Sequence, residues 1–183
     1  LLDSATTESH RLHQYIENLL QATKLQHGAL RFNKSTDSIL NVVSQTIDRF
    51  PESQQRIKLI AATPLPTLQI SSSLIEQAIF NVLDNALRYT PSDYMVNINA
   101  YQAGNDVILD IQDEGDGITI DQAVHIFDLF YSENTLKNND SGTGLGLAVA
   151  KGILTAHNGN VEAIPVTHGC LIRIRLPITK EEQ

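Results

Sequence analysis

A β-hairpin predicted in the middle of the chain restricts the fold more than any other single feature. Residues 95–101 and 107–112 carry apolar side chains at alternate positions, and the loop between them contains Gly104-Asn105. This alternation predicts two antiparallel strands, each with one buried face. The chain is therefore expected to build part of its core on a β-sheet.

Periodic patterns predict the remaining elements. Helices are expected over residues 1–27, 36–50, 74–89, from 121 onward and over 145–156, and strands over 30–34, 57–61 and 68–70 and twice near the C-terminus. The run Ser73-Leu74-Ile75-Glu76 has the form of a capping box at the start of the third helix. Asn158-Gly159 is expected to cap the last helix. In the final strand the even-numbered residues from 170 to 176 are expected to face the core.

The composition is that of a soluble globular protein, either one domain or one domain with an appendage. The 183 residues are 42% apolar and 19% charged, and the net charge of -8 argues against non-specific nucleic-acid binding. No apolar run approaches the roughly 18 residues of a membrane span, and there is no signal peptide. Cys170, the single cysteine, cannot form an internal disulfide. Because the chain begins with Leu1 rather than Met, we expect a fragment of a longer protein, which is compatible with a membrane-anchored parent.

The N-terminal helix carries a narrow apolar stripe among polar residues. The stripe has a period near 3.5 and consists of Leu2, Ala5, Leu12, Ile16, Leu19 and Thr23. A helix with so narrow a stripe is expected to need a partner helix, because it buries little on a globular surface. The alternative is a helix packed on its own domain.

The first of three polar clusters lies on the helix predicted over residues 74–89. Asn81, Asn85 and Arg88 occupy positions i, i+4 and i+7 and therefore share one face of that helix. Amide oxygens can bind Mg²⁺, and an arginine can pair with phosphate oxygens. Taken alone, the cluster could equally be an ordinary solvated face.

The second cluster follows the hairpin. Asp113 has the same parity as the apolar residues of the preceding strand, so its carboxylate is expected to continue a buried face. A buried charge needs a hydrogen-bond donor, and an adenine amino group is one such donor. Gly115 and Gly117 allow a tight turn and close approach to a ligand. The alternative is a simple turn at a strand end. The acidic residues here are spaced by three, which excludes an EF-hand calcium loop.

The third cluster is the glycine-rich run Gly142-Thr143-Gly144-Leu145-Gly146-Leu147, which leads directly into a predicted helix. Backbone amides at a helix start bind anions such as phosphate. The spacing matches neither a Rossmann fingerprint nor a P-loop. The alternative is a glycine-rich turn before a core helix. Phe127 and Phe130 are expected to be core or hinge residues, and residues 132–141 are polar and are expected to form a mobile loop.

The order of these clusters, with Phe127-Asp128-Leu129-Phe130-Tyr131 between the last two, resembles the N, G1, F and G2 boxes of sensor histidine kinases. The resemblance covers most of the chain. It implies an α/β two-layer sandwich, the histidine-kinase and Hsp90-like ATPase fold, in which a mixed sheet has helices on one face and a long helix precedes it. It also implies that ATP and Mg²⁺ bind under a flexible lid formed by residues 128–141.

The resemblance implies a role for each site residue. Asn85 would bind Mg²⁺, with Asn81 beside it, and Asn81 and Arg88 would serve catalysis. Asp113 would bind the adenine amino group and Tyr89 the base. The wider nucleotide site would comprise Asn81, Asn85, Arg88, Tyr89, Asp113, Gly115, Gly117, Ile118, Tyr131, Gly142, Thr143, Gly144, Leu145, Gly146 and Leu147. The Leu65-Pro66 run before the first cluster is similar to potassium-sensing Kdp-type sensors.

The resemblance also divides the chain and suggests its partners. Residues 1–28 would be the second helix of the hairpin that dimerises and carries the phosphoacceptor, and residues 29–183 the catalytic ATP-binding domain. The implied partners are a second copy, bound through the helical hairpin, and the receiver domain of a response regulator. The implied location is the cytoplasmic side of an inner membrane, with any membrane contact made by segments absent from this chain.

Two departures from the family pattern affect the expected activity. The acceptor motif is a histidine followed by Glu or Asp, and none of the six histidines has this neighbour. The acceptor is therefore expected upstream of this chain. Ser132 stands where the family carries a basic residue, and the sequence leaves open whether this impairs activity.

The expected function is phosphoryl transfer from ATP to a histidine. Two alternatives are an ATP-hydrolysing module of the same superfamily and a degenerate nucleotide-binding scaffold. The hydrolysing module would carry a Glu four residues before the metal-binding Asn, a position that Asn81 occupies here.

Overall fold

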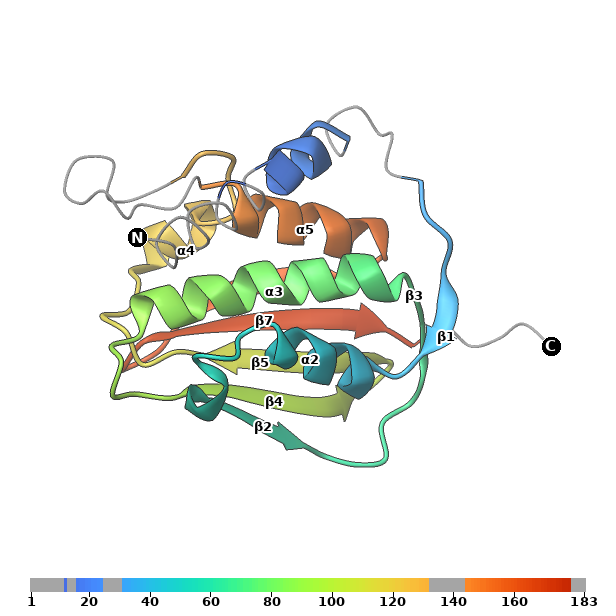
Figure 1. The fold of residues 1–183 in the computed structure, drawn as a ribbon, viewed down its shortest axis with the longest axis horizontal. Coiled ribbons are helices and arrows are strands. Elements are labelled where there is room, and N and C mark those ends of the chain that lie inside the picture. Colours follow the sequence, from blue (N-terminus) through green and yellow to red (C-terminus); the bar gives the residue numbers. More distant parts are fainter. Residues whose placement is uncertain (1–11, 13–15, 25–30, 132–143, 179–183) are drawn as a thin grey trace.

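The computed structural model describes residue 12 and residues 16–24, 31–131 and 144–178, and it centres on a five-stranded mixed sheet (Figure 1). The strand order is β2-β4-β5-β7-β6, with only β2 and β4 parallel among the paired neighbours. These strands are β2 (Ile57–Ala61), β4 (Val96–Ala103), β5 (Asp106–Gln112), β6 (Asn160–Pro165) and β7 (Cys170–Pro177). A separate antiparallel pair joins β1 (Ser35–Asp37) to β3 (Leu68–Ile70).

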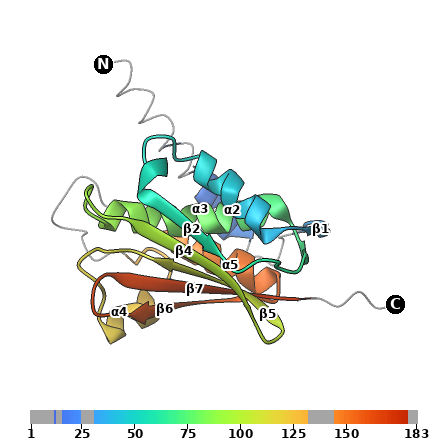
Figure 2. The same cartoon turned by 90° about the horizontal axis from the view of Figure 1, so that it is seen from below.

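Three helices cover one face of the sheet, as Figure 2 shows. They are α2 (Ile39–Asp48), α3 (Ser72–Tyr89) and α5 (Gly146–Ala156), and their apolar stripes form one core with the inward-facing strand residues. The short helix α4 (Ile120–His125) lies beside β6 at the sheet edge. The even-numbered residues of β7 face the core, as predicted. The predicted α/β two-layer sandwich is therefore confirmed.

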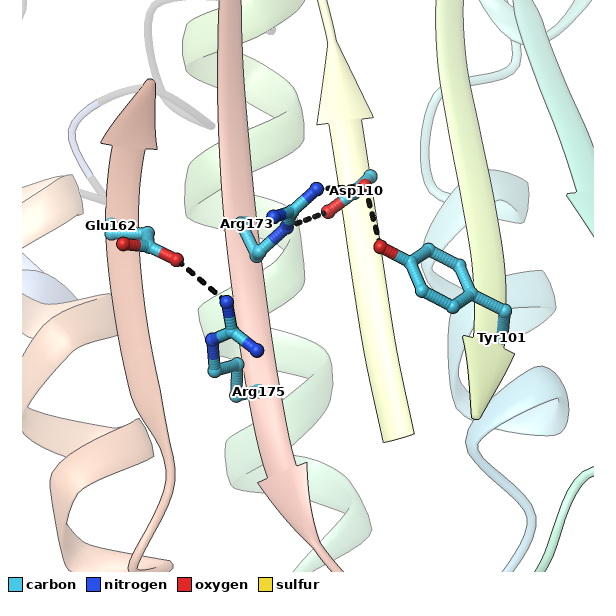
Figure 3. Close-up of polar contacts among 5 residues, drawn as sticks. All are labelled: Tyr101, Asp110, Glu162, Arg173 and Arg175. Carbon is cyan, nitrogen blue, oxygen red and sulfur yellow. Dashed lines mark hydrogen bonds and ion pairs between the residues drawn. The ribbon is translucent and has the colours of Figure 1, made fainter. Parts of the chain in front are cut away.

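The other face of the sheet carries two groups of polar and charged side chains (Figure 3). Arg173 makes two hydrogen bonds to the carboxylate of Asp110, at 2.7 and 2.8 Å, and the hydroxyl of Tyr101 donates to the same carboxylate at 3.0 Å. Arg175 pairs with Glu162 at 3.1 Å. Asp110 is 8% exposed, so these three donated bonds compensate for its loss of water.

Most predicted elements appear where the periodicity placed them. The hairpin turns at Gly104-Asn105, and β2 and β3 have the predicted bounds. The last helix ends as predicted, because Asn158 adopts a positive φ and Gly159 N donates to Leu154 O at 2.8 Å. This pattern is a Schellman motif.

Three local predictions are wrong. The strand expected over residues 30–34 is displaced: residues 31–34 have no regular structure, and β1 begins at Ser35. Phe32 instead stacks on a distant histidine ring, so its burial has a tertiary cause. The helix expected over residues 36–50 begins later, at Ile39, because Thr36 and Asp37 belong to β1. The capping box at residues 73–76 is also absent, because α3 begins at Ser72 and Glu76 pairs with Arg49 at 3.2 Å.

The N-terminal helix is described in part, at residue 12 and over residues 16–24. Within its predicted stripe, Leu12, Ile16 and Leu19 are 59%, 50% and 53% exposed. Leu2 and Ala5 lie outside the described residues. Within the described part of the chain no helix has the length and apolarity needed to cross a membrane.

Candidate functional site

The C-terminal half of α3 forms one wall of the candidate site. Asn81, Asn85 and Arg88 share one face, as their spacing requires. Their exposure rises along the helix: Asn81 is 4% exposed, Asn85 is half-buried and Arg88 is exposed. Tyr89, at the helix end, is 50% exposed. The wall therefore passes from a buried amide to an accessible aromatic ring.

Asp113 lies just beyond the end of β5 and is 5% exposed. Its Oδ1 accepts hydrogen bonds from the amides of Gly115 (2.9 Å) and Cys170 (3.0 Å). Burial raises the pKa of this carboxyl, and the two amide bonds oppose that rise. Among the described residues nothing donates to Oδ2, so this oxygen can accept a hydrogen bond from a ligand.

Glycines bring the segment after Asp113 against the end of α3. A Cβ on Gly115 would lie 2.5 Å from the carbonyl oxygen of Tyr89, a distance that no side chain tolerates. Gly117 has a φ of +84° and lies against Gly169, whose own φ is +77°. A Cβ on Gly169 would collide with the backbone of Asp113. Sequence analysis missed Gly169, although a glycine between two strands is a visible signal.

The start of α5 lies beside the buried end of this wall. A Cβ on Gly146 would be 3.7 Å from the side chain of Asn81. The first hydrogen bond of the helix runs from Val149 N to Leu145 O (2.9 Å), and the amides of the preceding turn have no partner within the helix. Such a helix end attracts anions. Gly142 and Thr143, also predicted here, lie outside the described residues.

Several predicted site residues pack against the core or against a neighbouring ring. Leu145 is buried in the core, and Leu147 and Ile118 are partly buried against it. Tyr131 is half-buried and stacks on His125, with ring centroids 6.2 Å apart.

The two ends of the segment between α4 and α5 lie close together. Phe127 is buried, as a core residue should be, whereas Phe130 is 69% exposed with a φ of +63°. The backbone amide of Phe130 donates to Gly144 O at 3.0 Å, which joins the two sides of the segment. A Cβ on Gly144 would lie 2.7 Å from the backbone of Phe130. The expected lid over residues 128–141 falls largely outside the described residues, as does Ser132.

The three clusters meet along α3. Gly146 lies beside Asn81, and Gly115 lies beside Tyr89 together with Asp113. Asn81 and Tyr89 are eight positions apart, which corresponds to roughly 12 Å of helix. The start of α5 and the buried carboxylate are therefore held at opposite ends of one wall.

The charge around the wall is mixed. Arg88 pairs with Asp84 at 2.8 Å, and both side chains are more than a third exposed. A phosphate could replace Asp84 as the partner of this guanidinium. No cluster of three or more His, Cys, Asp or Glu side chains suited to a metal occurs among the described residues. The amide oxygen of Asn85 is the type of ligand that Mg²⁺ accepts together with phosphates and waters.

Two residues that contact α3 were not identified from the sequence. Asn18, on the N-terminal helix, accepts a hydrogen bond from Asn81. His157, at the end of α5, is 3% exposed and bonds to the amide of Ser71 at the start of α3. No local pattern signals either contact, because the partners lie 63 and 86 residues apart.

Comparison with known proteins places this architecture in one family. Residues 70–180 match the model of the histidine kinase-, DNA gyrase B-, and HSP90-like ATPases. The chain is 35% identical over 182 residues to the sensor protein KdpD of Clostridium acetobutylicum, covering 97% of this chain and 20% of that protein. It is 31% identical to the sensor histidine kinase WalK of Bacillus subtilis, covering 96% of this chain and 30% of that protein. The chain thus spans less than a third of either of these relatives.

Solved structures show the same fold. The histidine kinase AdeS of Acinetobacter baumannii superposes with a TM-score of 0.76 at 22% identity, covering 98% of this chain and 84% of that one. Full-length ShkA in complex with AMPPNP superposes with a TM-score of 0.78 at 23% identity, covering 97% of this chain and 38% of that one.

Proposed function

The chain belongs to the family of histidine kinase-, DNA gyrase B-, and HSP90-like ATPases, and from this premise we propose that it is the catalytic part of a sensor histidine kinase. In this proposal it binds Mg-ATP and transfers the γ-phosphate to a histidine. The observation that carries the proposal is the meeting of three clusters along α3, with Gly146 beside Asn81 and with Gly115 and Asp113 beside Tyr89.

Adenine is assigned to the Asp113 end of the wall. Two backbone amides occupy Oδ1 of this carboxylate, which fixes its orientation and leaves Oδ2 to accept from an exocyclic amino group. Tyr89 is exposed enough to stack on a base. An unmatched buried acceptor discriminates strongly against ligands that lack the amino group, so the site favours adenine over guanine.

Phosphates and metal are assigned to the Gly146 end. The first amides of α5 would hold phosphate oxygens, and Asn85 would bind Mg²⁺ through its amide oxygen. The metal would neutralise charge on the phosphates. Arg88 would exchange its partner Asp84 for a phosphate oxygen. Phosphoryl transfer needs this positioning and charge neutralisation more than covalent chemistry by the protein.

The acceptor histidine is proposed to lie in another segment of the full protein, because no histidine of this chain precedes Glu or Asp. The exposed stripe of Leu12, Ile16 and Leu19 would pair with helices of a dimeric hairpin. The phosphoryl group would then pass to a response-regulator receiver domain. We place this part of the protein on the cytoplasmic side of the membrane, where ATP is available.

ATP hydrolysis is the second candidate function. The structure bears on whether Glu76 could activate a water molecule. Glu76 has no capping role, so it is not excluded on that ground. However, Glu76 pairs with Arg49 and precedes Asn81 by more than one helical turn. The position that would activate water carries Asn81, whose amide cannot act as a general base. Kinase activity is therefore favoured over hydrolysis.

Labelled ATP distinguishes these functions. The chain is mixed with a separate acceptor hairpin that contains a histidine followed by Glu, and with ATP labelled at the γ-phosphate. The kinase proposal expects acid-labile label on the hairpin, whereas released phosphate without labelled protein would favour hydrolysis. Acid-labile label on His10 or His13 of the chain alone would contradict the assignment of the acceptor to another segment.

A further inference from the structure

The N-terminal helix lies on the domain by a polar face. Over residues 16–24, the inward side chains are Asn18, Gln21 and Ala22, at positions i, i+3 and i+4. Asn18 is 4% exposed and Ala22 8%, whereas Ile16 and Leu19 are about half exposed. This is the reverse of an ordinary surface helix, which buries its apolar side. A polar contact on this face therefore contributes to holding the helix in this position.

Asn18 supplies that contact through one oxygen. Its Oδ1 accepts from Nδ2 of Asn81 at 3.2 Å and from Nε2 of Gln77 at 3.5 Å. The two donors lie one turn apart on α3, so a single carbonyl oxygen bridges successive turns of the helix that forms the site wall. Figure 1 shows the blue N-terminal segment above α5, the helix whose first residue lies against Asn81.

This contact determines which way the Asn81 amide faces. Its nitrogen is directed to Asn18, and its oxygen lies 3.8 Å from the position that a Cβ would take on Gly146, at the anion-binding end of α5. A metal ion or its bound water requires the oxygen of an amide, not the nitrogen. The contact with the helix therefore uses the nitrogen of this amide, whereas a metal ion or its bound water would use the oxygen.

We propose that Asn18 is a positioning residue of the nucleotide site, which holds the Asn81 amide with its oxygen toward Mg-nucleotide and thereby couples nucleotide binding to docking of the N-terminal helix. The inference rests on the proposed function. The coupling is positive. A docked helix raises the affinity for Mg-nucleotide, and by linkage bound Mg-nucleotide raises the population of the docked helix.

A second observation shows why docking can respond to a ligand. Oε1 of Gln21, on the same inward face, is buried and has no donor among the described residues. A buried acceptor without a partner opposes the docked position. Docking thus balances the Asn18 bridge and the burial of Ala22 against this cost, and a modest ligand contribution can shift the balance.

The test compares the full chain with its Asn18→Leu variant, which keeps the size of the side chain and removes the acceptor. Calorimetry with a non-hydrolysable ATP analogue is carried out with Mg²⁺ and with EDTA. We expect Asn18→Leu to weaken binding of the Mg²⁺ complex about fivefold or more, within the usual range of coupling between sites. Binding in EDTA should change less. Thr23→Ala is the matched control, because Thr23 is exposed on the same helix and bonds only within it.

Two further measurements separate positioning from a merely structural role. In an Asn81→Ala background, Asn18→Leu should not weaken binding of the Mg²⁺ complex further, because the amide that Asn18 orients is already absent. Hydrogen exchange should show that the Mg-analogue protects residues 16–24 in the parent chain and not in Asn18→Leu. Unchanged affinity in Asn18→Leu, or an equal loss in both backgrounds, would overturn this inference and leave the function standing. Absence of nucleotide binding by the parent chain would overturn the proposed function itself.

Discussion

The helix pair α3 and α5 is closed at one end and open at the other. The helices run antiparallel, so the last turn of α5 meets the first turn of α3 through His157 and Ser71, while the first residue of α5 reaches only Asn81, midway along α3. The last two turns of α3 extend beyond α5 and carry the candidate site. The contacts at the closed end are buried and stabilise the fold. The polar groups at the open end are accessible to a ligand.

At the closed end, both ring nitrogens of His157 have hydrogen-bond partners. Nδ1 of His157 donates to Ile153 O (2.8 Å), Nε2 accepts from Ser71 N (3.0 Å), and the ring stacks on Phe32 at 4.5 Å. These partners fix the neutral tautomer with the proton on Nδ1. Burial lowers the pKa of this histidine, and nearby Lys34 adds to the effect, although the bond to Ile153 opposes it.

At the open end, polar groups have partners that a ligand can replace or supplement. Arg88 holds a solvent-accessible Asp84, and Asp113 retains an oxygen without a donor among the described residues. Low stability is commonly concentrated where ligands bind, and stability elsewhere compensates for it. We therefore expect substitutions at the closed end to change stability and substitutions at the open end to change binding.

The largest effect is expected from His157→Ala. It leaves the buried amide of Ser71 without an acceptor and opens a cavity beside Phe32, which together should lower the free energy of unfolding by about 3 kcal/mol. Urea denaturation measures this loss, and His168→Ala is the control because His168 is exposed. Nucleotide affinity of the folded variant should stay within about twofold of the parent, equivalent to less than 0.5 kcal/mol. A tenfold loss of affinity would show that the closed end also affects nucleotide binding, which would contradict the separation of roles between the two ends.

Asp113→Asn should weaken nucleotide binding without lowering the free energy of unfolding. The amide oxygen can still accept from Gly115 and Cys170, but an amide group replaces the second carboxylate oxygen, so nucleotide binding should weaken by about 1–3 kcal/mol. Stability should not fall, because burial of the ionised carboxylate is unfavourable, as the raised pKa indicates. Calorimetry and urea denaturation are needed together. Asp116→Asn, exposed in the same loop, is the control.

Sequence patterns identified the polar residues of the open end but not the contacts of His157 at the closed end, for a physical reason. Asn81, Asp113 and the glycines of the third cluster are polar or flexible residues in unusual local patterns, and such patterns are visible one segment at a time. His157 depends on Ser71 and Phe32, which are far from it in the chain. Nothing around residue 157 distinguishes a structural histidine from an exposed one.

The errors in predicted elements have the same origin. The hairpin and β2 follow from local alternation and were placed correctly. The strand expected at residues 30–34 was inferred from apolar residues such as Phe32, whose burial comes from the distant His157. The expected capping role of Glu76 fails because Arg49, 27 residues earlier, binds it. Distances between motifs, such as that from Gly146 to Asn81, arise only when the chain folds.

The pH dependence of the free energy of unfolding tests the role of His157 at the closed end. His157 has a lowered pKa in the folded state, so below about pH 6.5, its ordinary value, the unfolded chain takes up a proton that the folded chain resists. Stability should therefore fall as pH decreases below 6.5, with a slope of at most about 1.4 kcal/mol per pH unit for one proton. His157→Gln can still accept from Ser71 and should lack this component. Asp113 and His125 are common to both proteins, so the difference between their profiles isolates His157.

The smallest effect is expected from Arg88→Ala, and its matched control is Arg49, which follows α2 and pairs with Glu76 near the start of α3. The exposed pair with Asp84 contributes little, so the free energy of unfolding should change by less than about 1 kcal/mol. Binding of ATP should weaken by about 1 kcal/mol, because the phosphate contact replaces an existing ion pair, and the loss should shrink at high salt. Arg49→Ala removes the pair with Glu76 and the guanidinium 4.1 Å from the Phe80 ring centroid, so it should reduce stability and leave ATP affinity unchanged. If both arginine variants lose affinity equally, α3 transmits changes along its whole length and the two ends are not independent.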